Sequence, residues 1–90
     1  MSRGIKYAQI PYEDCEKKGY SSGVEIEGMG RLYAKIFQDR RYTEYCVVDK
    51  NGAVRQMERK KIDILILSCF DFAEMKDIMD YLDSGKRYCW

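Results

Sequence analysis

The chain of 90 residues contains no histidine, and its four cysteines are scattered. Without histidine, the general base that most often works near neutral pH is absent. No two cysteines form the C-x-x-C pair that zinc sites usually use. The cysteines are Cys15, Cys46, Cys69 and Cys89. We therefore expect reduced, metal-free thiols in or near a core, no cofactor and no enzymatic activity.

Long apolar runs are also missing. The longest, residues 64–67, extends only to residue 70, whereas a membrane-spanning helix needs about 20 apolar residues. The first four residues show no apolar segment of a secretory signal. With 46% hydrophobic and 34% charged residues, the composition is typical of a globular domain. We expect a single domain over residues 1–90 in the cytoplasm, with no membrane contact, of the kind found in phages and mobile elements.

Alternating and β-branched segments predict most of the strands. Residues 5–10 form a short strand that ends at Pro11, and residues 12–18 a short helix that Gly19 closes. Strands follow at 24–27, 31–38 and 42–48, with a bulge or turn at 28–30 and a hairpin loop at 39–41. Asn51-Gly52 predicts a type I′ turn, after which 53–57 pairs back on 45–49.

The remaining third of the chain predicts one buried strand and one helix. Residues 58–61 are a polar connection, and residues 62–67 are apolar on both faces apart from Asp63, which indicates a strand covered on both sides. We expect Asp63 at the strand start, beside Lys60 and Lys61.

The helix is expected over residues 72–83. Asp71 and Glu74 have the spacing of a capping box, with Phe70 and Met75 as the hydrophobic staple. Its apolar stripe consists of Phe72, Met75, Ile78, Met79 and Leu82. The fold class is thus α+β: an antiparallel β-meander of about four strands, with a C-terminal helix packed on one face and a short N-terminal helix.

This element order resembles that of the double-stranded-RNA-binding domain. That family reads phosphates with lysines at the start of its final helix. Here the same place carries Phe70-Asp71-Phe72-Ala73-Glu74, which is acidic and apolar. The resemblance therefore does not guide the functional interpretation, and we assign no family.

The first candidate surface is a basic and aromatic sheet face. Because adjacent strand residues point to opposite sides, Leu32, Ala34 and Ile36 are expected in the core. The opposite face would carry Arg31, Tyr33, Lys35 and Phe37, joined at the hairpin by Arg40, Arg41 and Tyr42 and on the returning strand by Tyr45. Tyrosine and arginine are enriched at binding hot spots, and the same mixture stacks on bases and neutralises phosphates. The face is also compatible with an ordinary solvated sheet surface.

The second candidate surface is a row of acids at every third position of the predicted helix. Residues 28–62 hold nine Lys/Arg against four Asp/Glu, whereas residues 63–85 hold six acids against one lysine. The row consists of Asp71, Glu74, Asp77, Asp80 and Asp83. It is either a solvated face or a docking surface for a basic partner, including a nucleic-acid-binding protein.

These observations lead to one functional hypothesis and one alternative. The hypothesis is a small non-enzymatic, regulatory or inhibitor-like module that binds another protein. The alternative is a nucleic-acid-binding module that uses the basic and aromatic face. The oligomeric state is left open. The predicted partner-binding residues are Arg31, Tyr33, Lys35, Arg40, Arg41, Tyr42, Asp77 and Asp80.

Overall fold

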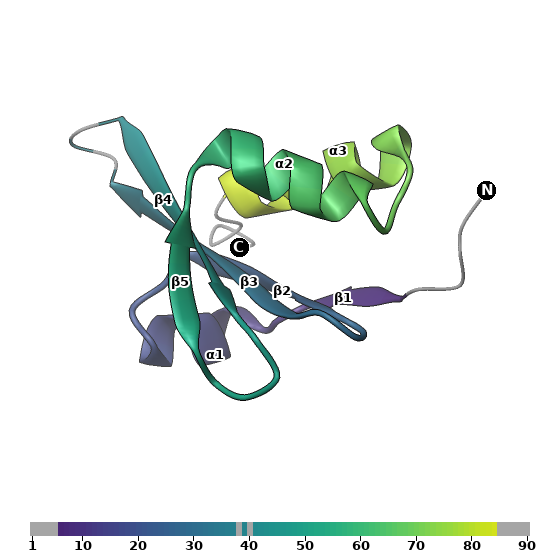
Figure 1. Cartoon of the computed structure of the whole chain (residues 1–90). Helices are drawn as coiled ribbons and strands as arrows, with labels where there is room; N and C mark the ends of the chain where they lie inside the picture. Colours follow the sequence, from purple (N-terminus) through teal and green to yellow (C-terminus); the bar gives the residue numbers. More distant parts are fainter. Residues whose placement is uncertain (1–5, 38, 40, 85–90) are drawn as a thin grey trace.

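The computed structural model describes residues 6–37, 39 and 41–84, and its centre is an antiparallel sheet (Figure 1). Five strands follow one another in sequence order, each paired with the next. They are β1 (Tyr7–Gln9), β2 (Ser22–Ile26), β3 (Gly30–Phe37), β4 (Tyr42–Val48) and β5 (Val54–Met57). The predicted α+β meander is confirmed, with one strand more than the four expected.

Three helices cover the sheet. α1 (Tyr12–Lys17) lies on one face, and α2 (Arg59–Leu67) and α3 (Phe72–Ser84) lie on the other (Figure 1). We call these the α1 face and the helix-pair face. None of the helices in the described part of the chain is long and apolar enough to cross a bilayer.

The β4–β5 turn has the predicted register but a different geometry. Val48 pairs with Val54 and Tyr45 with Met57, as expected. Gly52 has a φ of +89°, whereas Arg41 is the only non-glycine residue of the described part with positive φ. A type I′ turn needs positive φ at both central residues, so that prediction is wrong. The carboxylate of Asp49 instead accepts hydrogen bonds from the backbone N–H groups of Asn51 (2.9 Å) and Ala53 (3.0 Å), which stabilises a longer loop.

The predicted strand at 62–67 is wrong, because these residues belong to α2. Helix α2 begins at Arg59, so the polar connection expected at 58–61 forms its first turn. Ile62 and Ile66 are buried one helical turn apart, whereas Ile64 is 68% exposed. Short apolar runs do not distinguish a buried strand from a helix. Packing against α3 decides between them here.

Helix α3 confirms the predicted capping box. Asp71 Oδ1 accepts a hydrogen bond from the Glu74 N–H at 2.8 Å, and Glu74 Oε1 accepts one from the Asp71 N–H at 3.2 Å. These bonds satisfy donors that a helix start leaves without partners. Phe70 and Met75, the staple pair, are both buried.

The apolar stripe of α3 is confirmed except at its first residue. Phe72 is 66% exposed, so its assignment to the core is wrong. It stands at the first position of α3. The other four stripe residues are buried with α2 and the sheet: Met75, Ile78, Met79 and Leu82.

The buried residues form two separate clusters, one on each side of the sheet. The larger lies on the helix-pair face and includes Leu32, Ala34 and Val47. The smaller lies on the α1 face and contains Ile10, Cys15, Tyr33 and Cys46.

Candidate edge cleft and binding surface

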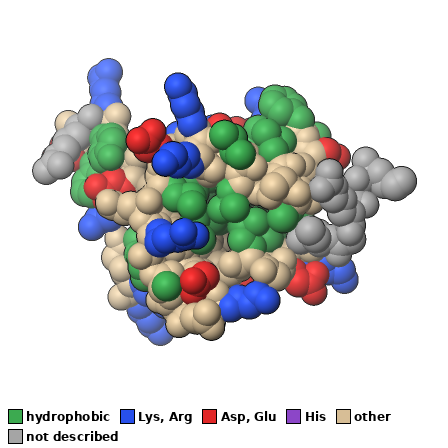
Figure 2. Space-filling view, viewed as in Figure 1, with side chains coloured by type: hydrophobic (Ala, Val, Ile, Leu, Met, Phe, Trp, Pro, Cys, Tyr) green, Lys and Arg blue, Asp and Glu red, His purple; other side chains and the backbone are tan. Residues whose placement is uncertain are grey.

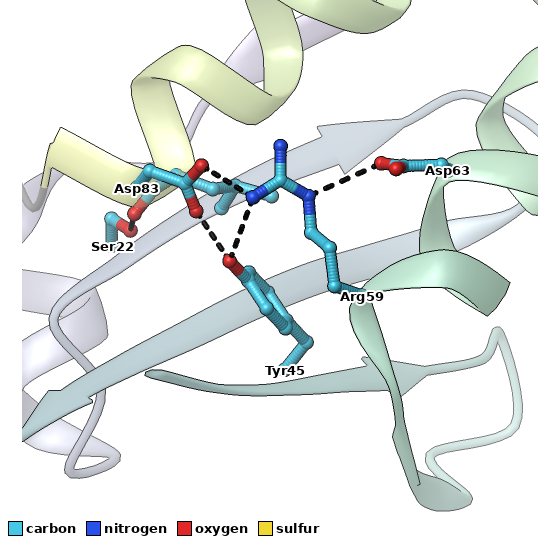
Figure 3. Close-up of polar contacts among 6 residues, drawn as sticks. Ser22, Tyr45, Arg59, Asp63 and Asp83 are labelled. Carbon is cyan, nitrogen blue, oxygen red and sulfur yellow. Dashed lines mark hydrogen bonds and ion pairs between the residues drawn. The ribbon is translucent and has the colours of Figure 1, made fainter. Parts of the chain in front are cut away.

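A polar network joins the sheet to both helices of the helix-pair face. Arg59 of α2 bonds Asp83 of α3 through Nη1 at 2.8 Å and Asp63 through Nε at 3.3 Å. The Tyr45 hydroxyl of β4 donates to Asp83 and lies 3.4 Å from Arg59 Nη1. Figure 3 shows Arg59 between the two carboxylates, with Tyr45 beneath. Asp63 therefore pairs with Arg59 along a helix, and its expected place beside Lys60 and Lys61 at a strand start is wrong.

The network changes the acidity of its members. Burial, followed by the hydrogen bond to Asp83, raises the pKa of Tyr45 to about 12. Burial alone would lower the pKa of Arg59, but Asp83, Tyr45 and Asp63 together raise it. Tyr45 therefore stays neutral and Arg59 stays charged at neutral pH. In the described part of the chain no buried side-chain nitrogen or oxygen lacks a partner, so we interpret the network as a structural connection.

A cleft of about 340 Å³ opens beside this network at the edge of the sheet. One wall comes from Tyr42, Thr43 and Glu44 of β4, and the other from the segment 56–59. We call it the edge cleft. It exists because β4 has seven residues and β5 only four. The first three residues of β4 therefore pair with β3 but have no β5 partner.

The hydrogen-bond alternation of the sheet determines which backbone groups face the edge cleft. The Asp49 N–H bonds the Ala53 carbonyl at 3.0 Å, so this pair is a hydrogen-bonded one. In antiparallel ladders hydrogen-bonded and non-hydrogen-bonded pairs alternate. Odd-numbered residues of β4 therefore direct their N–H and C=O toward β5. At Thr43 these groups point past the end of β5, into the edge cleft.

A second pocket continues the edge cleft onto the α1 face. It has a volume of about 280 Å³ and shares Glu44, Tyr45 and Gln56 with the edge cleft. Lys18 and Lys35 line its far side. The two hollows together form one groove around the sheet edge, with charged groups of both signs along it.

Part of the predicted basic and aromatic face lies on this groove. Lys35 Nζ lies 5.3 Å from the centre of the Phe37 ring, and Phe37 stacks on Tyr42 with ring centres 6.1 Å apart. Tyr42 remains 52% exposed. Arg41, which precedes it, is exposed and has a φ of 52°. Arg40 lies outside the described residues.

Tyr33 does not belong to that surface, although the alternation of β3 is as predicted. Its side chain points away from Leu32, but it is 1% exposed and stacks on Tyr20 at 4.5 Å. A solvent-facing role for Tyr33 is therefore wrong. The burial of Tyr33 depends on α1 and Tyr20, which cover this part of the sheet. The placement of Tyr45 on this face is also wrong, because Tyr45 is buried in the cluster on the helix-pair face.

The other predicted site residues lie apart from the edge cleft. Arg31, at the opposite end of β3, is exposed and lies 3.9 Å from Glu25 of β2. Asp77 and Asp80 are exposed on α3, across the sheet from Lys35. The structure therefore does not bring the eight predicted residues into one site.

The three cysteines in the described part of the chain show no catalytic arrangement. Cys15 and Cys46 are buried, and burial raises the pKa of both thiols. Cys69 is half-buried and free, and Cys89 lies outside the described residues. The described residues contain no group of three or more Cys, Asp or Glu side chains placed to hold a metal ion.

Sequence reasoning missed two features of the surface. One is the edge cleft, whose only signal is the unequal length of two paired strands. The other is a group of exposed apolar residues on α2 and α3: Ile64 (68%), Phe72 (66%) and Leu67 (37%). All three were expected to be buried, and only the helical conformation of residues 59–67 exposes the two on α2.

Comparison with protein-family models, curated proteins and solved structures finds no match for this chain.

Proposed function

We propose that this protein is a small non-enzymatic, regulatory or inhibitor-like module that binds another protein at the edge cleft. One observation carries the proposal: β4 extends past β5, and the open strand edge at Tyr42–Glu44 lines a cleft of about 340 Å³. Extended peptides bind such edges by adding a strand, with main-chain hydrogen bonds for affinity and side-chain pockets for specificity.

The chemistry of the cleft walls suits an extended protein segment. Thr43 offers main-chain groups, Tyr42 and Met57 offer apolar area, and Glu58 and Arg59 offer one charge of each sign. Tyrosine is enriched at binding hot spots because it combines apolar area with a directed hydroxyl group. The proposed site of action is the cytoplasm, a reducing compartment in which free thiols such as Cys69 persist.

Two variants with a matched control test this function. Tyr42→Ala removes a side chain of the groove, and Thr43→Pro removes the N–H that faces the edge cleft. Tyr12→Ala is the control, because Tyr12 is 41% exposed but lies on α1. Host proteins captured by the tagged wild type are quantified by mass spectrometry for each variant, after circular dichroism shows the wild-type fold.

We expect the wild type to capture a host protein. Tyr42→Ala and Thr43→Pro should each reduce the captured amount about tenfold or more, whereas Tyr12→Ala should capture as much as the wild type. Equal capture by all four proteins would contradict the edge cleft as the contact surface.

Nucleic-acid binding is the second candidate, and the Lys35–Phe37–Tyr42 arrangement favours it. A cation beside two stacked rings suits the phosphates and bases of a single strand. Glu44 and Glu58, however, line the same groove and would repel phosphate. Fluorescence anisotropy with a labelled single-stranded oligonucleotide separates the two functions. Tight binding that weakens steeply with added salt is the outcome expected of a nucleic-acid module.

A further inference from the structure

The last helix ends beside the edge cleft. α3 ends at Ser84. The carboxylate of the preceding Asp83 accepts hydrogen bonds from the Tyr45 hydroxyl and from Arg59 Nη1, the latter at 2.8 Å. Tyr45 and Arg59 both line the edge cleft. The chain that follows α3 therefore begins at the Tyr45 end of the cleft.

Residues 85–90, which we call the tail, lie outside the described residues, and their sequence is Gly85-Lys86-Arg87-Tyr88-Cys89-Trp90. A glycine directly after a helix favours a change of chain direction. Six extended residues span roughly 20 Å. The β4 wall of the edge cleft, residues 42–45, is about 13 Å long on the same scale. The tail is therefore long enough to run along the whole wall.

Two carboxylates of the edge cleft form no ion pair within the described part of the chain. They belong to Glu44 and Glu58. Lys35 is the cross-strand neighbour of Glu44, but its Nζ lies 5.3 Å from the centre of the Phe37 ring. Arg59 is already engaged by two other carboxylates. A basic residue on the open side of Glu44 would continue the alternation of charge across the sheet, because opposite charges stabilise cross-strand pairs.

The order of residue types along the tail matches the order along the cleft. Counted from α3, the basic pair Lys86-Arg87 comes before the aromatic Tyr88. Counted from the same end, the cleft wall presents Glu44 before Tyr42, whose ring is 52% exposed. A segment that runs in this direction is antiparallel to β4, as β5 is.

Charge alone does not select an occupant for the edge cleft. Figure 2 shows basic, acidic and hydrophobic side chains mixed over the side of the molecule on which α2 and β5 lie. The tail is distinguished by its attachment, because a segment tethered beside a site is present there at an effective concentration of roughly millimolar. A free segment of the same composition lacks this advantage.

We infer that the tail occupies the edge cleft of its own chain as an added strand, antiparallel to β4. Its main chain bonds the N–H and C=O of Thr43. Its basic pair lies beside Glu44 and Glu58, and Tyr88 lies beside Tyr42. The inference rests on the proposed function in one respect, which is that the edge cleft accepts an extended segment. It adds regulation, since the tail competes with the partner's segment for the same strand edge.

Amide hydrogen exchange of the full chain, followed by NMR, tests the contact. We expect the Thr43 N–H to exchange at least about tenfold faster in Lys86→Glu/Arg87→Glu than in the wild type, because the cleft carboxylates repel the substituted tail. The matched control is Lys6→Glu/Lys76→Glu, which makes the same change of net charge at exposed lysines outside the cleft. The control should keep the wild-type rate.

An internal reference shows that the sheet is intact in each variant. The Asp49 N–H, bonded to the Ala53 carbonyl at 3.0 Å, should exchange at one rate in all of them. Equal Thr43 rates in the wild type and the tail variant would overturn the inference. So would an equal acceleration in the Lys6→Glu/Lys76→Glu control.

A charge exchange tests which groups meet. Glu44→Lys/Glu58→Lys should accelerate the Thr43 exchange as the tail variant does. Glu58 makes no side-chain capping bond to α2, so this change leaves the helix start intact. Combining the two double variants should restore slow exchange, because the acidic tail then meets a basic cleft. Fast exchange in the combined variant would overturn the assignment of the basic pair to these carboxylates.

The tail of a second copy is the competing occupant. In that case the protection of Thr43 would rise with protein concentration, and native mass spectrometry would show a dimer of the 10.7 kDa chain. That outcome would overturn the inference. A monomer with one Thr43 rate from about 20 to 500 µM supports it.

No partner protein enters these measurements, so they separate the tail contact from the proposed function. If neither the wild type nor Lys86→Glu/Arg87→Glu captures a host protein, the proposed function fails. A slowly exchanging Thr43 N–H that the tail variant accelerates would still support the tail contact.

Discussion

The two faces of the sheet are covered very differently. On the helix-pair face, thirteen buried residues from the sheet and two helices form one cluster, whereas the α1 face holds four. α1 has only six residues and leaves the β4–β5 end of its face open. We conclude that the helix-pair face supplies most of the stability and that the sparse cover of the other face leaves room for the groove. Four predictions test this comparison.

The largest effect is expected from Leu82→Ala in the larger cluster. Leu82 is fully buried, and its carbonyl accepts a hydrogen bond from Ser22 Oγ at 2.8 Å. Removing its side chain should lower the free energy of unfolding by about 2–5 kcal/mol, because a cavity adds to the lost burial. Urea denaturation measures it. A loss comparable to that of an exposed residue would mean that the helix-pair face does not dominate stability.

A smaller loss is expected from Gly23→Ala in the α1-face cluster. A Cβ atom at Gly23 would lie 2.8 Å from Tyr33 Cδ1 and 3.1 Å from Cys15 Sγ. Because the clash is with side chains at the edge of a small cluster, we expect a loss of about 1–3 kcal/mol, the usual range for overpacking. Thermal and urea unfolding measure it. If Gly23→Ala is as stable as the wild type, this cluster is loosely packed.

The pH dependence of stability tests one tyrosine on each face of the sheet, Tyr45 on the helix-pair face and Tyr20 on the α1 face. The pKa of Tyr45 is raised from 10.0 to about 12, and the hydrogen bond with Cys46, followed by burial, raises that of Tyr20 to about 12. A raised pKa means that the folded state holds its proton longer than the unfolded chain. The associated stability is therefore complete below pH 10.0 and falls as pH rises toward about 12.

Tyr45→Phe and Tyr20→Phe should each reduce this alkaline loss. The measurements are phenolate absorbance and urea unfolding across the same pH window. A Tyr45 hydroxyl that titrates at its ordinary pKa would contradict the network with Asp83 and Arg59.

The smallest effect is expected from Phe72→Ala. At 66% exposure, the ring contributes little to folding, so the free energy of unfolding should stay within about 0.5 kcal/mol of wild type. Urea denaturation measures this free energy for the variant and the wild type. A loss of unfolding free energy as large as that of Leu82→Ala would show that Phe72 is packed in the core.

Some local features of the candidate binding surface were predictable, but their grouping was not. The alternation along β3 correctly separated Lys35 from Leu32, and Tyr42 was correctly expected at the surface. The alternation could not show that Tyr33, on the same side as Lys35, is covered by α1 and Tyr20. Nor could it show that Arg31 and Lys35 stand at opposite ends of a strand with buried Tyr33 between them.

The sequence by itself determined the features whose cause lies within a few residues. The capping box of Asp71 and Glu74, the β4–β5 register and the alternation of β3 depend on neighbouring side chains and backbone geometry, so local patterns predict them. The tertiary structure decided the conformation of residues 62–67, the burial of Tyr33 and the edge cleft. Each depends on a distant element: α3 beside α2, α1 over β3, and a short β5 beside a longer β4. A local pattern specifies which side chains can be buried, but the elements that pack above them decide which ones are.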